Sequence, residues 1–87
     1  MKVIQLHSFN GNKVPNQFVI EMKDKIFFQS YNSIIAEVSH GIIYLDPVYY
    51  NYSKTTSKYL YMFLNMNKKQ IQDNLKSGKI QFKNLNQ

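Results

Sequence analysis

The sequence contains no cysteine, no arginine and no tryptophan. Without cysteine the chain can form no disulfide, no thiolate metal site and no thiol nucleophile, and the reducing cytosol is the compartment that we expect. Without arginine, all eleven basic residues are lysine, a flexible point charge that favours diffuse electrostatic attachment over bidentate clamping of a base or phosphate. An A/T-rich genome explains this usage, so the missing arginine does not indicate functional selection.

Long apolar runs are also missing. No stretch approaches the roughly 20 residues that span a bilayer, and the first residues lack the features of a signal peptide, so we expect no membrane association and no export. The 87 residues give room for one domain, spanning 1–87. Because a domain of this size removes only about 60% of its unfolded surface from water, we expect no large enclosed active site. With 44% apolar residues, three glycines and two prolines, the composition is that of a folded protein.

Catalytic and metal-binding patterns are absent from the sequence. His7 falls in an expected strand and His40 at an expected hairpin tip, and neither has a cysteine or paired carboxylate nearby. The glycines are explained by turns or a helix cap, which leaves no phosphate-cradling loop. We therefore expect a protein that is not an enzyme and holds no metal and no cofactor. Folding that brings His40, Asp46 and Ser53 together remains an alternative.

Alternating apolar residues in the first half predict an antiparallel meander. Asn10-Gly11 is the strongest turn signal in the chain, because both residues tolerate positive φ. A second turn is expected at 23–25, a third at 39–41, and the meander should stop at Asp46-Pro47. The expected strands are residues 1–9, 17–22, 26–31, 33–38 and 42–45.

From Ser53 onward the apolar period becomes helical. Thr56, Tyr59, Leu60 and Phe63 follow helical spacing, with Ser53 or Thr55 as the N-cap. This helix should pack on the sheet.

A second short helix is predicted after Asn67. Asn67 and Gln70 have the form of a capping box, Ile71 and Leu75 supply an apolar stripe, and Gly78 suits a left-handed C-terminal position. Residues 79–83 alternate again and predict a final strand, followed by a few frayed residues. The fold class is therefore α+β: an antiparallel β-meander of about 4–5 strands, then two short helices and a final strand.

The net charge of +6 lies wholly in the second part of the chain. Residues 1–50 contain four lysines and four acidic residues, whereas residues 51–87 contain seven lysines against Asp73 alone. Such an asymmetry is typical of a surface that meets a polyanion.

Helical phase places part of this charge on one face of the first helix. Tyr61 is expected to stand outside between lysines, where an aromatic ring can stack on a base while ammonium groups meet phosphates. Ordinary solvation of a surface helix, with Lys69 and Asp73 as a simple i, i+4 pair, is the alternative interpretation. The candidate binding surface comprises Lys54, Lys58, Tyr61, Asn65, Lys68, Lys69, Lys76, Tyr49 and Tyr50.

Several segments carry a resemblance to a known family: Asn16 to Ile20, Phe28 to Ala36, Tyr44 to Asp46, Tyr52 to Tyr59, Phe63-Leu64 and Lys76 to Gly78. Together they resemble a family of small uncharacterised bacteriophage proteins over nearly the whole chain. The chain departs from that family at Tyr49-Tyr50, where a Tyr-Trp-like pair is expected. The family has no established catalytic residues to carry over.

The resemblance implies a small phage accessory protein that acts in the host bacterial cytoplasm. Such proteins commonly bind host replication, transcription or defence machinery, and anti-CRISPR-type inhibitors are one subset. Our leading hypothesis is a non-enzymatic protein that binds a host nucleoprotein complex or an acidic protein surface through its C-terminal helices. The alternatives are an autonomous DNA- or RNA-binding protein and, third, a phage structural or assembly protein. The oligomeric state stays open.

Overall fold

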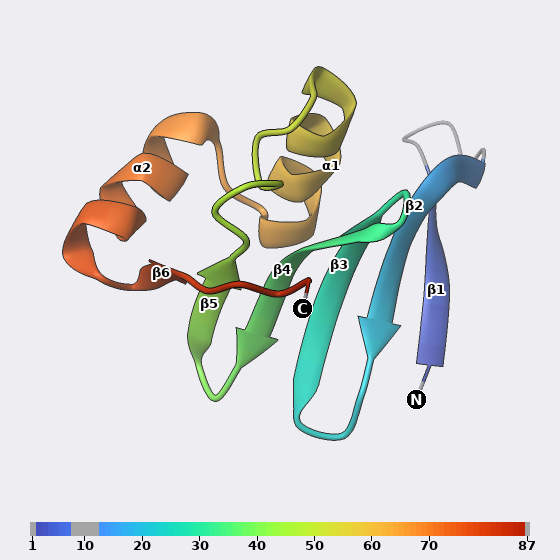
Figure 1. The fold of residues 1–87 in the computed structure, drawn as a ribbon, viewed down its shortest axis with the longest axis horizontal. Helices are drawn as coiled ribbons and strands as arrows, with labels where there is room; N and C mark the ends of the chain where they lie inside the picture. The colour runs from blue at the N-terminus through green and yellow to red at the C-terminus, as the bar shows by residue number, and fades with distance from the viewer. Residues whose placement is uncertain (1, 8–12, 87) are drawn as a thin grey trace.

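The computed structural model describes residues 2–7 and 13–86, which form one sheet accompanied by two helices (Figure 1). The chain runs through β1 (Lys2–His7), β2 (Lys13–Glu21), β3 (Lys25–Ser30), β4 (Ser33–Ser39), β5 (Ile42–Leu45), α1 (Lys54–Leu64), α2 (Lys68–Ser77) and β6 (Ile80–Phe82). Neighbours in the sheet follow the order of the chain and pair antiparallel, except that β6 joins β5 in parallel. The predicted α+β class, with its meander, two helices and final strand, is confirmed.

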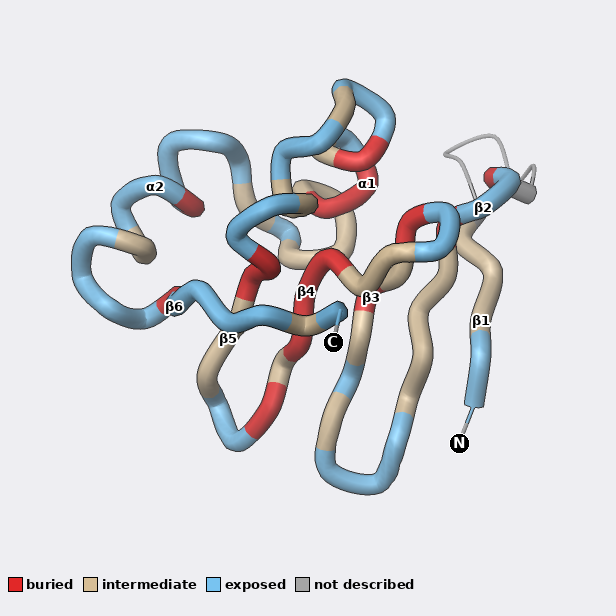
Figure 2. The backbone as a smooth tube through the Cα atoms, in the orientation of Figure 1, coloured by how far each residue is buried: buried red, intermediate tan, exposed pale blue. Residues whose placement is uncertain are grey.

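The core lies between the sheet and the helices. In β3 the side chains of Phe28 and Ser30 face the helices and are buried, while the alternate residues face the other way. Phe63 of α1 stacks on Phe28 with ring centroids 5.6 Å apart. Figure 2 shows buried segments concentrated on β4, β5 and the adjoining part of α1. The buried apolar residues are Val14, Phe28, Ile35, Ala36, Leu45, Tyr59, Leu60, Ile71 and Ile80.

Both helices begin where the sequence predicts, and α2 also ends where the sequence predicts. The Ser53 hydroxyl accepts the backbone N–H of Thr56 at 3.1 Å, which selects Ser53 over Thr55 as the N-cap of α1. Asn67 and Gln70 form the reciprocal capping box of α2, with two hydrogen bonds of 2.8 Å. Gly78 ends α2 at φ 85°, a conformation that glycine adopts without strain.

Some strand boundaries differ from the prediction. β2 begins at Lys13 and includes Pro15. The missing N–H of this proline is tolerated because the β1–β2 register shifts between Gln5 and His7, and because pairing of β2 with β3 begins only at Gln17. Met22 and Tyr31 lie outside the strands, in the turns that follow β2 and β3. The expected Asn10-Gly11 turn and the end of the first predicted strand lie outside the described residues.

The residues after β6 are not frayed. Asp46, which is 2% exposed, accepts the backbone N–H groups of Val48 and Tyr49 on one carboxylate oxygen. Its other oxygen accepts the backbone N–H of Leu85 and the side-chain amide of Asn86. Burial raises the pKa of the Asp46 carboxyl, but these hydrogen bonds outweigh burial, so the pKa lies below its ordinary value. Asp46 therefore ties the C-terminal segment to the loop before α1.

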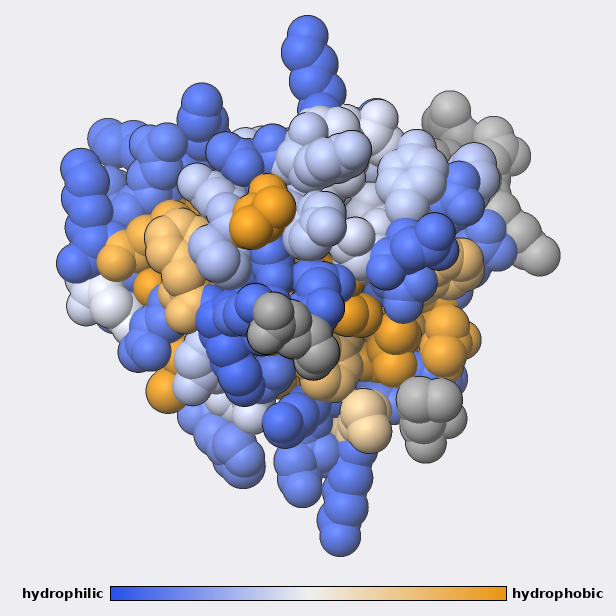
Figure 3. Space-filling model, in the orientation of Figure 1, coloured by the Kyte–Doolittle hydropathy of each residue, from blue (hydrophilic) through white to orange (hydrophobic). Residues whose placement is uncertain are grey.

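Hydrophilic and apolar side chains are unevenly distributed on the surface. Figure 3 shows hydrophilic side chains over α2, at the left, and a group of apolar side chains over β1 and β2, at the right. Val3 on β1 is 55% exposed. No helix among the described residues is long and apolar enough to cross a membrane.

Candidate functional site

The predicted binding residues of α1 line a connected surface. Lys54 and Lys58 are exposed one turn apart and line a shallow depression together with Tyr61. Two further depressions share the ring of Tyr61. One, of about 270 Å³, lies between α1 and α2 and includes Tyr50 and Lys68, and the other includes Asn65.

We call this surface the helix groove. It is centred on Tyr61 and lies between the loop before α1, α1 itself and the start of α2. Its defining residues are Tyr50, Asn51, Lys54, Ser57, Lys58, Tyr61, Asn65 and Lys68. Sequence reasoning missed Asn51 and Ser57. Asn51 reaches the groove because the loop before α1 folds against that helix, whereas Ser57 lies on α1 one turn before Tyr61.

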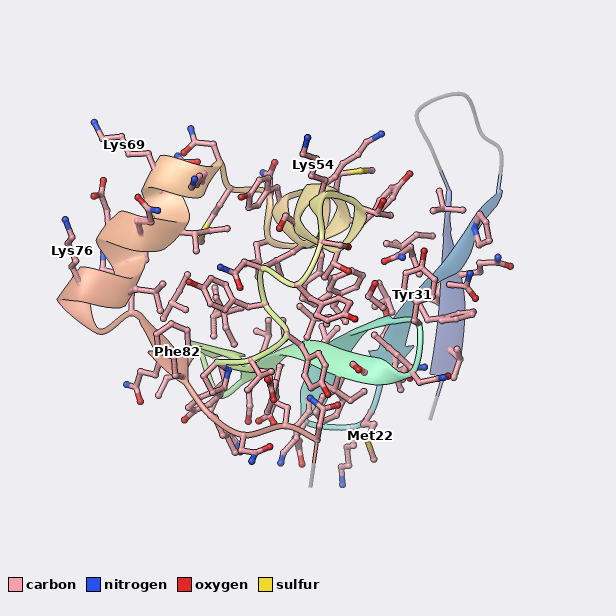
Figure 4. All side chains as sticks on the ribbon, turned by 45° about the horizontal axis from the view of Figure 1, so that its top comes forward. Met22, Tyr31, Lys54, Lys69, Lys76 and Phe82 are labelled. Atoms are coloured by element: carbon pink, nitrogen blue, oxygen red, sulfur yellow. The ribbon has the colours of Figure 1, made fainter. Side chains whose placement is uncertain are left out.

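Charge in the helix groove is uncompensated. Its lining residues include three lysines and no acidic residue. Without a nearby carboxylate, the potentials of Lys54, Lys58 and Lys68 add. Figure 4 shows Lys54 extending away from α1 into solvent.

Lys69 and Lys76 lie on a different face of α2. At 100° per residue they share that face with Asp73, whereas Lys68 and Gln72 face the groove. The expected ion pair between Lys69 and Asp73 is not formed in the described structure, since both ion pairs found there involve Glu37. The lysine-first order is the weaker orientation for an i, i+4 pair, which accounts for the difference.

Lys83 does not add to the positive charge that a partner could meet, because its ammonium is already paired. Its ammonium lies 3.5 Å from Glu37, a side chain that is almost wholly buried, and 4.9 Å from the ring centroid of Tyr44. Lys25 approaches the same carboxylate at 3.9 Å. Lys83 therefore compensates the negative charge of Glu37 and does not extend the basic surface.

Tyr61 is less exposed than its helical phase predicts. The ring is partly buried against the core, because α1 is covered on this side by the loop before it and by α2. A partner can therefore reach part of the ring but cannot enclose it. Tyr61 was expected to stand outside the helix, and the structure leaves the residue partly in solvent and partly packed against the core.

Asn65 and the two tyrosines before α1 have separate structural roles. Asn65 ends α1 at φ 54°, and its backbone N–H bonds the carbonyls of Met62 and Tyr61. Tyr50 lines the groove and contacts Phe82 at 5.3 Å between ring centroids. Tyr49 lines a different hollow, so the structure does not bring the two tyrosines to one surface.

The structure does not bring together His40 and Asp46, two residues of the alternative catalytic group. His40 lies in the turn before β5 and Asp46 directly after β5, so a whole strand separates them. Both oxygens of Asp46 are occupied by hydrogen bonds. Within residues 2–7 and 13–86, no cluster of three histidine, aspartate or glutamate side chains is placed to hold a metal ion.

Comparison with known proteins gives one match. No curated protein and no solved structure matches the chain. A family model described as "Family of unknown function (DUF8033)" matches residues 1–82. The chain therefore belongs to the DUF8033 family.

Proposed function

We propose that the chain is a non-catalytic binding protein that engages an acidic partner through the helix groove. The partner is a host nucleoprotein complex or an acidic protein surface, and the context is that of a phage accessory protein acting in the host bacterial cytoplasm, including the anti-CRISPR-type anti-defence class. The observation that carries the proposal is the placement of Lys54, Lys58 and Lys68 around Tyr61 without an acidic neighbour.

The chemistry of the groove favours an extended anionic partner. Lysine ammoniums on flexible stems adjust to phosphates or carboxylates without fixing one geometry. Charges at the protein surface are screened over about 8 Å at physiological salt, so a partner must approach closely to gain from all three. The exposed part of the Tyr61 ring adds an apolar contact at the centre, as in interfaces where an aromatic anchor is surrounded by charge.

Affinity purification from host lysate tests the proposal. The intact tagged chain is compared with a groove variant, Lys54→Gln/Lys58→Gln/Lys68→Gln, and with a control of equal net charge, Lys69→Gln/Lys76→Gln/Lys79→Gln. We expect a stoichiometric partner with the wild type and the control and a strong loss with the groove variant. Nuclease treatment separates a nucleoprotein from a purely protein partner. Equal recovery by both variants would assign binding to total charge and refute the groove.

Autonomous binding of DNA or RNA is the second candidate, favoured by the accessible part of Tyr61 beside Lys54 and Lys58. Each phosphate contact contributes about 0.7 to 0.9 to the slope of log affinity against log salt. We therefore expect the groove variant to lower the slope by about 2 to 3, with a smaller change in the control. Binding that is absent or insensitive to salt would remove this candidate.

A further inference from the structure

A second hollow lies outside the helix groove, on the other side of the loop before α1. It has a volume of about 350 Å³, at the small end of the range for ligand pockets. The turn between β3 and β4, the loop before α1 and the first turn of α1 form its walls. We call it the aromatic hollow, lined by Ser30, Tyr31, Asn32, Ser33, Ile35, Tyr49, Tyr52 and Thr56.

Three tyrosines give the hollow aromatic walls. Tyr49 and Tyr52 lie 5.8 Å apart between ring centroids with their planes tilted by 50°. Tyr52 is 72% exposed and Tyr31 is 52% exposed, so both leave much of their surface to solvent. Figure 4 shows Tyr31 at the end of the sheet, in the turn that borders the hollow.

The position of Tyr31 is unfavourable for an aromatic residue. Its φ is 57°, in the left-handed region that a bulky side chain rarely adopts. Two hydrogen bonds of 2.7 Å hold it there: its N–H donates to the carbonyl of Asn16, and its carbonyl accepts from the side-chain amide of Gln29. Such outliers persist where the surroundings enforce them, and they gather at functional sites.

The floor of the hollow carries an unused hydrogen-bond donor. The Ser53 hydroxyl donates to Thr56 Oγ1 at 3.1 Å, and the hydroxyls of Thr56 and Ser30 lie 2.9 Å apart with either as donor. Three hydroxyl protons serve two bonds, so one O–H on Ser30 or Thr56 has no partner among the described residues. Both residues line the hollow.

Gln17 adds a second unused polar group beside this floor. It is directly opposite Ser30 in the β2–β3 ladder, so the two side chains lie on the same face of the sheet. Gln17 is fully buried, and neither the oxygen nor the nitrogen of its amide has a hydrogen-bond partner in the described structure. A buried amide without a partner is rare enough in native proteins to require an explanation.

We propose that the aromatic hollow binds one unpaired base of a single-stranded nucleic acid. Tyr31 and Tyr52 offer surfaces on which a base stacks, and the unused hydroxyl on Ser30 or Thr56 offers a donor to the edge of the base. Lys54, two residues after Tyr52, lines the helix groove and supplies a cation for a phosphate of such a strand. A phenylalanine ring of a protein partner would leave the polar floor unused.

The inference goes beyond the proposed function, because it depends on the residues of the hollow and not on the groove lysines. Binding of fluorescently labelled short strands separates the two. The probes are oligo-deoxyadenosine, oligo-deoxythymidine and a base-free deoxyribose phosphate strand of equal length. We expect wild type to bind at least one base-containing strand about 5- to 150-fold more tightly than the base-free strand, the ratio that one stacked base supplies.

Tyr31→Gly and Tyr52→Leu test the walls of the hollow, with Phe82→Leu as a control at another exposed aromatic residue. Glycine adopts positive φ without strain, so Tyr31→Gly should keep the fold, which circular dichroism checks. We expect both hollow variants to lose the preference for bases while their binding to the base-free strand is unchanged. Phe82→Leu should keep the preference.

The remaining outcomes discriminate between the two proposals. Equal binding of all strands by wild type, or binding of none, would overturn the base site and leave a protein partner for the groove untouched. A preference for bases that survives both tyrosine changes would place the base elsewhere and also overturn the inference. A preference that is lost in the tyrosine variants but kept in Lys54→Gln/Lys58→Gln/Lys68→Gln would support the hollow, since the base-free strand carries the same phosphates.

Discussion

Replacing the buried amide of Gln17 by a thioether should stabilise the protein. Gln17 is 0% exposed, and its amide oxygen and nitrogen make no hydrogen bond within the described residues. A buried polar group without a partner costs about 1–3 kcal/mol, the desolvation penalty that folding does not recover. Methionine has nearly the same length and volume, so Gln17→Met removes the penalty without opening a cavity. We expect the free energy of unfolding to rise by about 1–3 kcal/mol.

Gln5 offers a matched control for the same chemical change. Its side-chain amide donates to the carbonyl of Val14 at 3.2 Å, so Gln5→Met removes a hydrogen bond that exists. We expect this variant to lose about 0.5–1.5 kcal/mol. The two substitutions should therefore shift stability in opposite directions, although each exchanges the same two side chains.

Chemical and thermal unfolding measure the difference. In a domain of this size, 1 kcal/mol shifts the midpoint temperature by roughly 4–8 °C, well above experimental error. The dependence of unfolding free energy on denaturant should stay unchanged, since neither substitution alters the area buried. If Gln17→Met unfolds at a lower temperature than wild type, the amide has a partner that stabilises the fold, and the reasoning about an unsatisfied amide fails.

Five further substitutions test the roles of Asp46, Asn65 and Lys83. Hydrogen bonds lower the pKa of Asp46 in the folded protein, so the stability that its carboxylate contributes is present above its unfolded pKa near 4 and is lost as the pH falls through the lower folded pKa. Asp46→Asn should therefore cost about 2–4 kcal/mol of unfolding free energy at neutral pH and less in acid, as measured by chemical unfolding at both pH values. Asn65 caps α1 at positive φ, so Asn65→Gly should change the unfolding free energy by only a few tenths of a kcal/mol, whereas Asn65→Ala should cost about 1 kcal/mol. Calorimetry measures both variants, and equal losses would contradict the capping role. Lys83→Met should lower the unfolding free energy by less than about 1 kcal/mol, because the lysine that pairs with Glu37 is half exposed. Lys79→Met should have no effect on the unfolding free energy. A larger loss in Lys79→Met than in Lys83→Met would show that the net charge, and not the ion pair with Glu37, sets the stability.

Local sequence signals predicted most of the fold. Asn67 and Gly78 act at helix ends within a few residues of themselves, so their roles follow from the sequence, which left Ser53 or Thr55 as the N-cap of α1. The strand at 42–45 was likewise predicted with its observed bounds, since a turn and Asp46-Pro47 frame it. Such features depend on contacts of short range.

The site depended on contacts that no local pattern contains. Helical phase places Lys54, Lys58 and Tyr61 on one face, but it cannot show that the loop before α1 and α2 cover part of that face and draw Tyr61 toward the core. The sequence alone suggests that Lys83 is a free charge. The structure places it beside Glu37, which is 46 residues away in the chain. The aromatic hollow likewise joins residues 30–35 to residues 49–56.

Departures from local rules gather at the aromatic hollow. Outside glycine, positive φ occurs among the described residues at Asn16, Tyr31, His40 and Asn65, and all but Tyr31 are residue types enriched in that region. Gln17, the buried amide without a partner, lies opposite Ser30, the residue that precedes Tyr31. A strained aromatic and an unsatisfied amide each lower stability, yet they adjoin one small hollow while the helix caps follow their rules. Because natural sequences break local rules mainly where function requires it, their coincidence argues for a binding site at this place rather than for two unrelated defects.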